Sequence, residues 1–302
     1  MANGSSSQEA LHIEPIVLRR RPSSLNVVIG LAKRKPLGAI GAILVIGLLF
    51  IAIFAPYVAP YDPYQIYADN VLTPPDRTFL LGTDELGRDV LSRIIFGARI
   101  SLYVGFLCIA TGITLGAFVG VISAYYGGTF DLVVQRIIDA IMAFPGLILA
   151  LAIMAALGQS LNNVVIALAV VQIPNAARVL RSQSLSVKQS QYVEAAKAIG
   201  CSDSRIIFQH IMPNCVAPYL IVATAALAYV IVREASLSFL GVGTPPPIPS
   251  WGGMLTKAAQ QYVQTAPWVA ISPGIALSLA VFGINLLGDA IRDVLDPRLR
   301  GR

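Results

Sequence analysis

Charged residues are scarce in this sequence, which excludes an ordinary soluble domain. They make up 13% of the 302 residues, whereas soluble proteins carry about a quarter, and hydrophobic residues reach 56%. This balance indicates a chain that crosses a membrane several times. The net charge of +6 comes from basic residues beside apolar segments, as membrane topology and anionic lipid favour, with no basic groove interleaved with aromatics. We therefore expect a surrounding lipid bilayer and no nucleic-acid partner.

Cysteine and histidine are too few and too scattered for metal or disulfide chemistry. Cys108, Cys201 and Cys215 do not form a metal framework, and two of them fall in segments expected in or facing the cytoplasm. His210 has no cysteine or carboxylate at ligand spacing, and the other histidine is His12 near the start of the chain. We expect no disulfide and no metal site.

The motifs of nucleotide binding and hydrolysis are also missing. The sequence has no Gly-x4-Gly-Lys-Ser/Thr loop, so it cannot cradle ATP phosphates in a P-loop. It also lacks His-Glu-x-x-His and Gly-x-Ser-x-Gly, which argues against an intramembrane enzyme. We expect no catalytic residue and no cofactor bound by this chain.

Long apolar runs are abundant and predict an all-α protein. Crossing about 30 Å of hydrocarbon takes roughly 20 apolar residues, and the sequence predicts six spans, at 37–59, 100–124, 132–157, 162–180, 216–241 and 268–290. Residues 1–36 are then a cytoplasmic tail and 37–302 a transmembrane domain. This domain has an outer loop with an interfacial helix at 60–99 and a polar cytoplasmic loop at 181–215.

The distribution of lysine and arginine sets the orientation. The N-terminal tail holds six, the 178–214 loop five, the C-terminal tail four and the 125–136 turn one. The opposite side has five, which are Arg77, Arg88, Arg93, Arg99 and Lys257. The positive-inside rule therefore predicts that both termini and the 178–214 loop are cytoplasmic.

Small residues and proline predict how two of the spans pack. Gly112, Gly116 and Gly120 repeat every four residues, which allows a second helix to approach closely. Pro145 and Gly146 predict a kink within the third span, either beside a translocation path or for packing alone.

Polar residues inside the spans suggest structural pairs. Asp131, Gln135 and Asp139 recur every four residues, and Arg136 is placed to pair with Asp139, so this stripe is expected to face the protein interior.

Arg233 and Glu234 lie near the outer end of the fifth span. Charges are costly in lipid and suggest function, but their shallow depth favours snorkelling or a structural ion pair.

The polar interruption at 191–213 predicts two short helices hinged at Gly200. Ser202 or Asp203 is placed to cap the second helix, and Pro213 is expected to end it. An alanine pair forms the contact face of the first helix, so the element is suited to a groove on another protein.

A second polar stretch, at 81–102, predicts a helix on the outer membrane surface. Thr83 is a suitable N-cap, and Asp84 and Glu85 would complement the helix dipole in the first turn.

Two ordered motifs carry a family resemblance. Glu-Ala-Ala, three residues, Gly, and Pro thirteen residues further on, within 191–213, resembles the coupling motif of permeases from ATP-driven importers. Gly-Thr-Asp-x-x-Gly-Arg-Asp-x-x-Ser-Arg-x-x-x-Gly-x-Arg-x-Ser-Leu, at 82–102, resembles the C-type subunit of the dipeptide/oligopeptide/nickel ABC importers. Shorter matches at 54–63, 237–241 and 249–252 extend the resemblance over about residues 36 to 300.

The resemblance implies a type I ABC importer permease fold with six transmembrane helices and cytoplasmic coupling helices. It assigns ATPase coupling to Glu194, Ala195, Ala196, Gly200, Ser202, Asp203, His210 and Pro213. It assigns an outer-face motif to Thr83, Asp84, Gly87, Arg88, Asp89, Ser92, Arg93, Gly97 and Arg99.

The resemblance also implies partners. These are a homologous B-type permease that forms the other half of the pore, two ATP-binding subunits that hold ATP and Mg, and an extracytoplasmic solute-binding protein. Dipeptide or oligopeptide import across a bacterial or archaeal plasma (inner) membrane is the function expected. Phe79 in place of the usual outer histidine and an altered run at 173–178 leave nickel chelates and glutathione as alternative cargoes. A secondary transporter, the rival of another class, would need an inverted repeat with buried ionisable sites.

Overall fold

The computed structural model describes residues 36–257 and 261–295, and this part of the chain is helical. Its only strand pairing is an isolated bridge between Thr83 and Asp89. The α-helices are α2 (Pro36–Ile53), α3 (Ala55–Val58), α4 (Val90–Cys108), α5 (Thr114–Tyr126), α6 (Gly128–Met142), α7 (Gly146–Leu157), α8 (Leu161–Lys188), α9 (Gln191–Ala198), α10 (Asp203–Arg205), α11 (Met212–Phe239), α12 (Trp251–Lys257) and α13 (Trp268–Leu295). Wider π-helical turns are η2 (Ile109–Ile113) and η3 (Ile206–Ile211), and η1 (Ala68–Asn70) is a 3₁₀ turn.

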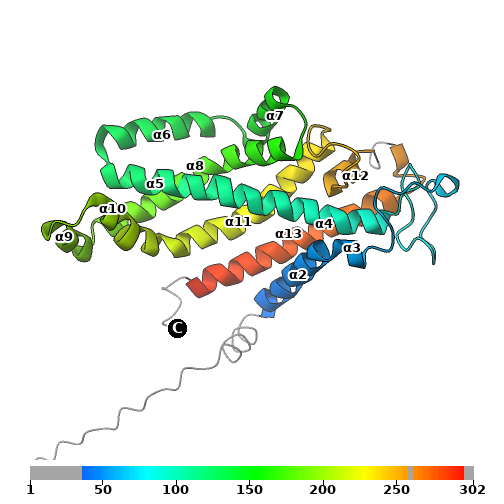
Figure 1. Cartoon of the computed structure of the whole chain (residues 1–302), viewed down its shortest axis with the longest axis horizontal. Coiled ribbons are helices and arrows are strands. Elements are labelled where there is room, and N and C mark those ends of the chain that lie inside the picture. Colours follow the sequence, from blue (N-terminus) through cyan, green and yellow to red (C-terminus); the bar gives the residue numbers. More distant parts are fainter. Residues whose placement is uncertain (1–35, 258–260, 296–302) are drawn as a thin grey trace, which may run out of the picture. The chain divides into compact units, whose positions relative to one another are not determined.

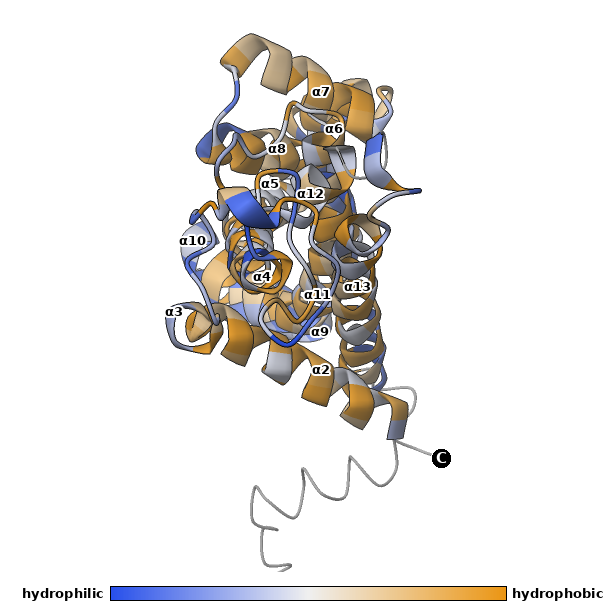
Figure 2. Cartoon of the chain, turned by 90° about the vertical axis from the view of Figure 1, so that its right-hand side faces the viewer, coloured by the Kyte–Doolittle hydropathy of each residue, from blue (hydrophilic) through white to orange (hydrophobic). Residues whose placement is uncertain are grey.

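Five of the described helices are long and apolar enough to cross a membrane, and a bent pair makes a sixth candidate span. Two of them are continuous over 37 residues, because η2 joins α4 to α5 and η3 joins α10 to α11. Within the helical domain, α9 and α10 lie at one end of the long helices, and the loop before α4 lies with α12 at the other (Figure 1). The outward faces of the long helices are largely apolar, as lipid contact requires (Figure 2).

The second span begins earlier than the sequence predicted. Its helix starts at Val90 and runs straight into the apolar part, so a separate interfacial helix leading into residue 100 was wrong. Asp89 is the N-cap, and its carboxylate accepts a hydrogen bond from the Ser92 backbone N–H at 2.7 Å. Residues 71–89 instead form an irregular loop that packs over the end of the bundle.

The glycine stripe brings α5 and η2 into backbone contact with α8, as predicted. A Cβ added to Gly112 would lie 2.5 Å from the Ala169 carbonyl oxygen, and one added to Gly120 would lie 2.2 Å from that of Ala177. Gly116 approaches the Ile173 carbonyl in the same way. Any side chain on this face would push the two helices apart.

The predicted kink at Pro145 is a complete break. The helix α6 ends at Met142, α7 starts at Gly146, and their axes differ by 88°. Proline has no N–H to donate and disfavours helical geometry in the preceding residue, so the helix cannot continue through Phe144 and Pro145. The bent pair α6 and α7, which we call the α6–α7 wall, therefore turns sharply beside α8.

Candidate functional site

The polar element at 191–213 is mounted on the chain's own core. Val193 and Ala196 are 0% and 5% exposed and pack in a cluster with Leu180, Ile207 and Ile211. The alanine pair therefore does not share one contact face: Ala196 points inward, and Ala195 is exposed. Residues 195 and 196 differ by about 100° around a helix, which explains why only one of them is free.

Gly200 forms the turn that the sequence predicted. Its φ of +81° is left-handed, the Gly200 N–H donates to the Lys197 carbonyl, and the Cys201 N–H donates to the Ala196 carbonyl, both at 3.0 Å. This pair of bonds is a Schellman motif, in which glycine ends a helix without strain. It leaves Ile199 standing out from the turn with 81% of its surface exposed.

The second half of the element differs from the prediction in two respects. Ser202 occupies the N-cap position of α10, but its side chain makes no capping hydrogen bond. Pro213 does not end the helix, because it comes just after the π-helical turn η3, where the regular hydrogen-bond pattern that a proline would break is already interrupted. The chain therefore passes from Asp203 to Phe239 as one continuous helix.

Tyr125, at the end of α5, fastens the element to the long helices. Its hydroxyl donates to the Asp203 carboxylate at 2.5 Å, and the Lys197 ammonium lies 5.5 Å from its ring centre. Lys188 donates to its backbone carbonyl at 2.6 Å. These contacts tie α5, α8, α9 and α10 together at this end of the bundle.

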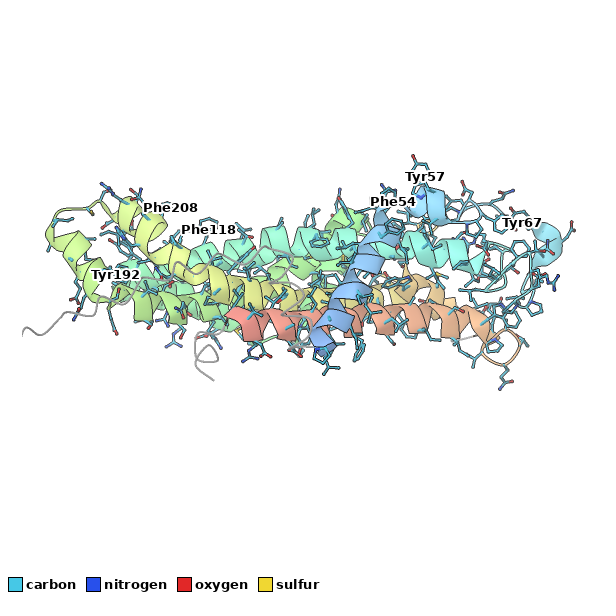
Figure 3. The ribbon with its side chains drawn as sticks, turned by 90° about the horizontal axis from the view of Figure 1, so that it is seen from below. Phe54, Tyr57, Tyr67, Phe118, Tyr192 and Phe208 are labelled. Carbon is cyan, nitrogen blue, oxygen red and sulfur yellow. The ribbon has the colours of Figure 1, made fainter. Side chains whose placement is uncertain are left out.

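The free surface of the element combines polar and large apolar side chains. Ile199 is joined by Tyr192 and Phe208, which are 46% and 57% exposed and lie at the same end of the bundle (Figure 3). Glu194 is also exposed, and the His210 ring lies 6.3 Å from that of Tyr192. Motif matching missed Ile199 and Phe208, whose signal is a large apolar residue within a polar segment. Such residues form the centres of protein interfaces.

The outer-face motif is built around Asp84. This carboxylate accepts from the Arg88 backbone N–H at 2.9 Å and from Arg88 Nε at 2.7 Å, and Arg93 Nε lies 3.4 Å away. Arg93 also donates to the Pro63 carbonyl at 3.0 Å. Because these groups are buried, the motif holds the outer loop onto α4.

Thr83 is not the N-cap that the sequence predicted. It is fully buried, its hydroxyl donates to the Asn70 carbonyl, and its oxygen accepts from the Thr73 N–H. Gly87 is left-handed, with a φ of +73°, and an added Cβ would lie 2.1 Å from the Tyr67 carbonyl oxygen. A threonine in a tight tertiary turn and a threonine at a helix start look alike in sequence.

The remaining motif residues lie along the first turns of α4. Asp89 and Ser92 are fully buried, and Gly97 leaves room for Trp251, whose indole N–H donates to the Ile94 carbonyl at 3.0 Å. Arg99 is exposed. Apart from Arg99, the outer motif is an internal scaffold rather than an open surface.

A groove of about 650 Å³ opens between the α6–α7 break, α8 and α11. Its walls are mainly apolar, with a few polar side chains that include Gln172, Asn175, Tyr229 and Arg233. Arg233 donates to the Gln172 side-chain oxygen at 3.1 Å. The Pro145–Gly146 break is the one part of this groove that the sequence indicated, because the other walls come together only in the fold.

Glu234 neither snorkels nor pairs with its neighbour in sequence. It is completely buried and accepts from the hydroxyls of Ser238 at 2.9 Å, Thr244 at 3.2 Å and Ser101 at 3.3 Å. Those hydroxyls come from α11, from the loop after it and from α4. The predicted snorkelling or ion pair was therefore wrong for this residue.

The acidic stripe of α6 pairs with arginines of α8. Asp139 accepts from Arg178 at 2.7 Å, and the predicted contact with Arg136 is also present, at 3.7 Å. The Asp131 carboxylate accepts hydrogen bonds from both Nε and Nη2 of Arg181. The sequence predicted that the stripe faces the protein interior. It faces α8, with Asp131 largely covered and Asp139 half exposed.

Comparison with solved structures shows the fold, and a family model shows the class of protein. A chain of the MetNI methionine ABC transporter, in an inward-facing conformation, matches with a TM-score of 0.57 and 19% identity over 68% of this chain and 96% of that one. The fold is that of an ABC importer permease. Residues 112–301 match the family of binding-protein-dependent transport system inner membrane components, and this chain belongs to that family.

A second matching family and three relatives show which type of permease this chain resembles. Residues 32–75 match the N-terminal TM domain of oligopeptide transport permease C. The dipeptide transport system permease protein DppC of Alkalihalophilus pseudofirmus is 41% identical over 268 residues, which cover 89% of this chain and 88% of that protein. The di/tripeptide permease DppC of Pseudomonas aeruginosa is 42% identical, covering 87% and 89%. The glutathione permease GsiD of Escherichia coli is 42% identical, covering 89% of each chain.

Proposed function

We propose that this chain forms half of the translocation pore of an ATP-driven importer of dipeptides or oligopeptides. The observation that carries the proposal is the α9–α10 element, which is fixed to the core on one side and exposes the large apolar side chains of Ile199, Tyr192 and Phe208. A permease with no P-loop of its own needs such a docking surface. The cargo is supported by the names of the peptide-transporting relatives.

The partners follow from this role. A homologous B-type permease completes the pore. Two ATP-binding subunits hold ATP and Mg, and one of them docks on α9 and α10 of this chain. An extracytoplasmic solute-binding protein delivers the cargo to the face that carries the outer loop. The chain then lies in a bacterial or archaeal plasma membrane with both termini in the cytoplasm, as the excess of basic residues at that side favours.

The residues of the element have separate roles in this mechanism. Ile199 and Glu194 contact the ATPase, and Gly200 fixes the turn that presents them. Tyr125 and the buried Ala196 pass the displacement of α9 to the long helices. ATP binding then favours one of two arrangements of those helices because the docked ATPases contact the two arrangements differently.

Ile199 provides the test of docking. In the complete importer, Ile199→Asp should abolish peptide uptake and the stimulation of ATP hydrolysis, because it buries a charge in the interface. Ile199→Leu is the matched control and should keep both, since it preserves apolar volume. Both variants should reach the membrane in normal amounts. Normal transport by Ile199→Asp would refute the docking role, and ion-driven uptake by the isolated chain would point to a secondary transporter.

Glutathione is a second candidate cargo because a relative of equal identity and coverage carries that name. A competition assay separates the candidates: labelled dipeptide uptake is measured against excess unlabelled oligopeptide, glutathione or nickel–histidine complex. Competition by peptides alone supports the proposed cargo, and competition by glutathione alone replaces it.

A further inference from the structure

We propose that Arg233 is a transit site for the carboxylate of the translocated peptide. This inference rests on the proposed function and names a residue that takes part in it. Arg233 lines the groove between the α6–α7 break, α8 and α11, one helical turn from Tyr229, which also lines it.

The charge of Arg233 is not neutralised within the described part of the chain. Across residues 36–257 and 261–295, its polar contact is the hydrogen bond to Gln172, a neutral group, and it forms no ion pair. The neighbouring Glu234 does not neutralise it, because Glu234 points about 100° away around the helix and is buried among the hydroxyl groups of Ser238, Thr244 and Ser101. An arginine without a counter-charge is energetically costly in a membrane-spanning helix, so its presence indicates a functional partner.

The contrast with the other arginines near the groove supports this reading. Arg178 and Arg181 each have a carboxylate from α6 within 2.7 Å. Among the residues that the structure describes, those that line the groove include Arg233 and Arg292 but no aspartate or glutamate. The described charged residues of the lining are therefore both positive, which favours an anionic group in the groove over a cationic one.

The surroundings of the guanidinium add to this potential. A Cβ built on Gly146 would lie 3.2 Å from Arg233 Nη2, so the first residue of α7 closes over the side chain. The N-terminal end of α7 has no side-chain cap, and its dipole places partial positive charge beside a cation. An anion between the two relieves this repulsion. Gln172 holds one edge of the guanidinium and leaves the other donors for a ligand.

The cargo of the proposed importer supplies such an anion. Every unmodified peptide ends in a carboxylate, which pairs with a guanidinium through two parallel hydrogen bonds. Because the carboxylate is common to all peptides, one arginine in the path recognises the class without selecting a sequence. A carboxylate on the second permease is the competing partner, and the experiment below distinguishes it.

The first measurement is uptake by the complete importer in proteoliposomes, with trialanine as the probe. Arg233→Gln should lower its rate at least roughly tenfold, because glutamine removes the charge and leaves at most one neutral hydrogen bond in place of two charge-assisted ones. Arg233→Lys should recover part of the rate. Arg136→Gln is the matched control, because Arg136 is exposed and lies outside the groove, and it should transport normally.

The second measurement is binding to the permease–ATPase complex without the solute-binding protein, by saturation-transfer NMR at millimolar peptide. Trialanine should give a signal with the unsubstituted complex and lose it with Arg233→Gln, whereas its C-terminal amide should give equal signals with both. Equal loss for trialanine and its amide would overturn the proposal in favour of a partner-subunit carboxylate, and no loss for either would overturn it outright. Absence of peptide uptake by the unsubstituted importer would instead refute the proposed function.

Discussion

The contact between α5 and α8 gives the sharpest prediction about stability. Gly120→Ala places a Cβ 2.2 Å from the Ala177 carbonyl oxygen, about 1 Å closer than an ordinary C···O contact. The obstacle is backbone, so no rotamer change relieves it, and α8 must move. Overpacking of this kind costs about 1–3 kcal/mol.

Gly47→Ala, in the interior of α2, is the matched control. A Cβ at Gly47 meets nothing within 4 Å. Both substitutions gain the same helix propensity, about 1 kcal/mol, so this gain cancels when the two variants are compared. What remains is the overpacking term at Gly120.

Thermal unfolding of the purified chain in detergent measures this difference. For a chain of this size, about 1–3 kcal/mol corresponds to a Tm for Gly120→Ala roughly 2–10 °C below that of Gly47→Ala. Equal Tm values for the two variants would show that α5 and α8 are not in backbone contact, and the close-packing explanation of the stripe would be refuted.

Three further substitutions test individual contacts. Glu234→Gln should unfold near the original Tm because it still accepts hydroxyl hydrogen bonds, whereas Glu234→Leu strands three buried hydroxyls at about 1 kcal/mol or more each and should lower Tm clearly. Tyr125→Phe removes the bond to Asp203 but keeps the ring under Lys197, so hydrogen exchange in α10 should quicken about fivefold at unchanged Tm. Asp84→Asn weakens the pair with Arg88, and limited proteolysis should then cut the outer loop faster while the helices stay intact.

The sequence predicts the spans well because their signals are local and additive. Twenty apolar residues in a row are enough to indicate a crossing, and the four-residue spacing of Gly112, Gly116 and Gly120 already implies a close helix contact. The helix end at Gly200 was equally predictable, since a glycine between two polar helical segments is the usual way in which a helix ends. None of these inferences needs knowledge of residues far away in the chain.

The helix start at Asp89 and the role of Glu234 could not be predicted from the sequence, because both depend on residues far away in the chain. Thr83 and Asp89 both have capping side chains, and only the packing of residues 70–73 around Thr83 decides between them. Glu234 is close to the end of its span in sequence, which suggests shallow depth. Its burial depends on Ser101, 133 residues earlier, and on the loop at Thr244 folding back over it.

Two kinds of helix contact determine which part of the chain is expected to move. The α5–α8 interface is backbone against backbone, and sliding it loses close packing along the whole stripe. The α9–α10 element is fastened to α5 through Tyr125 and to α8 and α11 through the buried cluster around Leu180 and Ile207. A force on α9 is therefore expected to carry α5, α8 and α11 together. The α6–α7 wall is broken at Pro145 and is joined to α8 by the Asp131–Arg181 and Asp139–Arg178 pairs instead of a glycine stripe. Side-chain pairs can exchange partners more easily than a close backbone contact can slide, so we expect relative motion beside Arg233, in the groove between the two bodies.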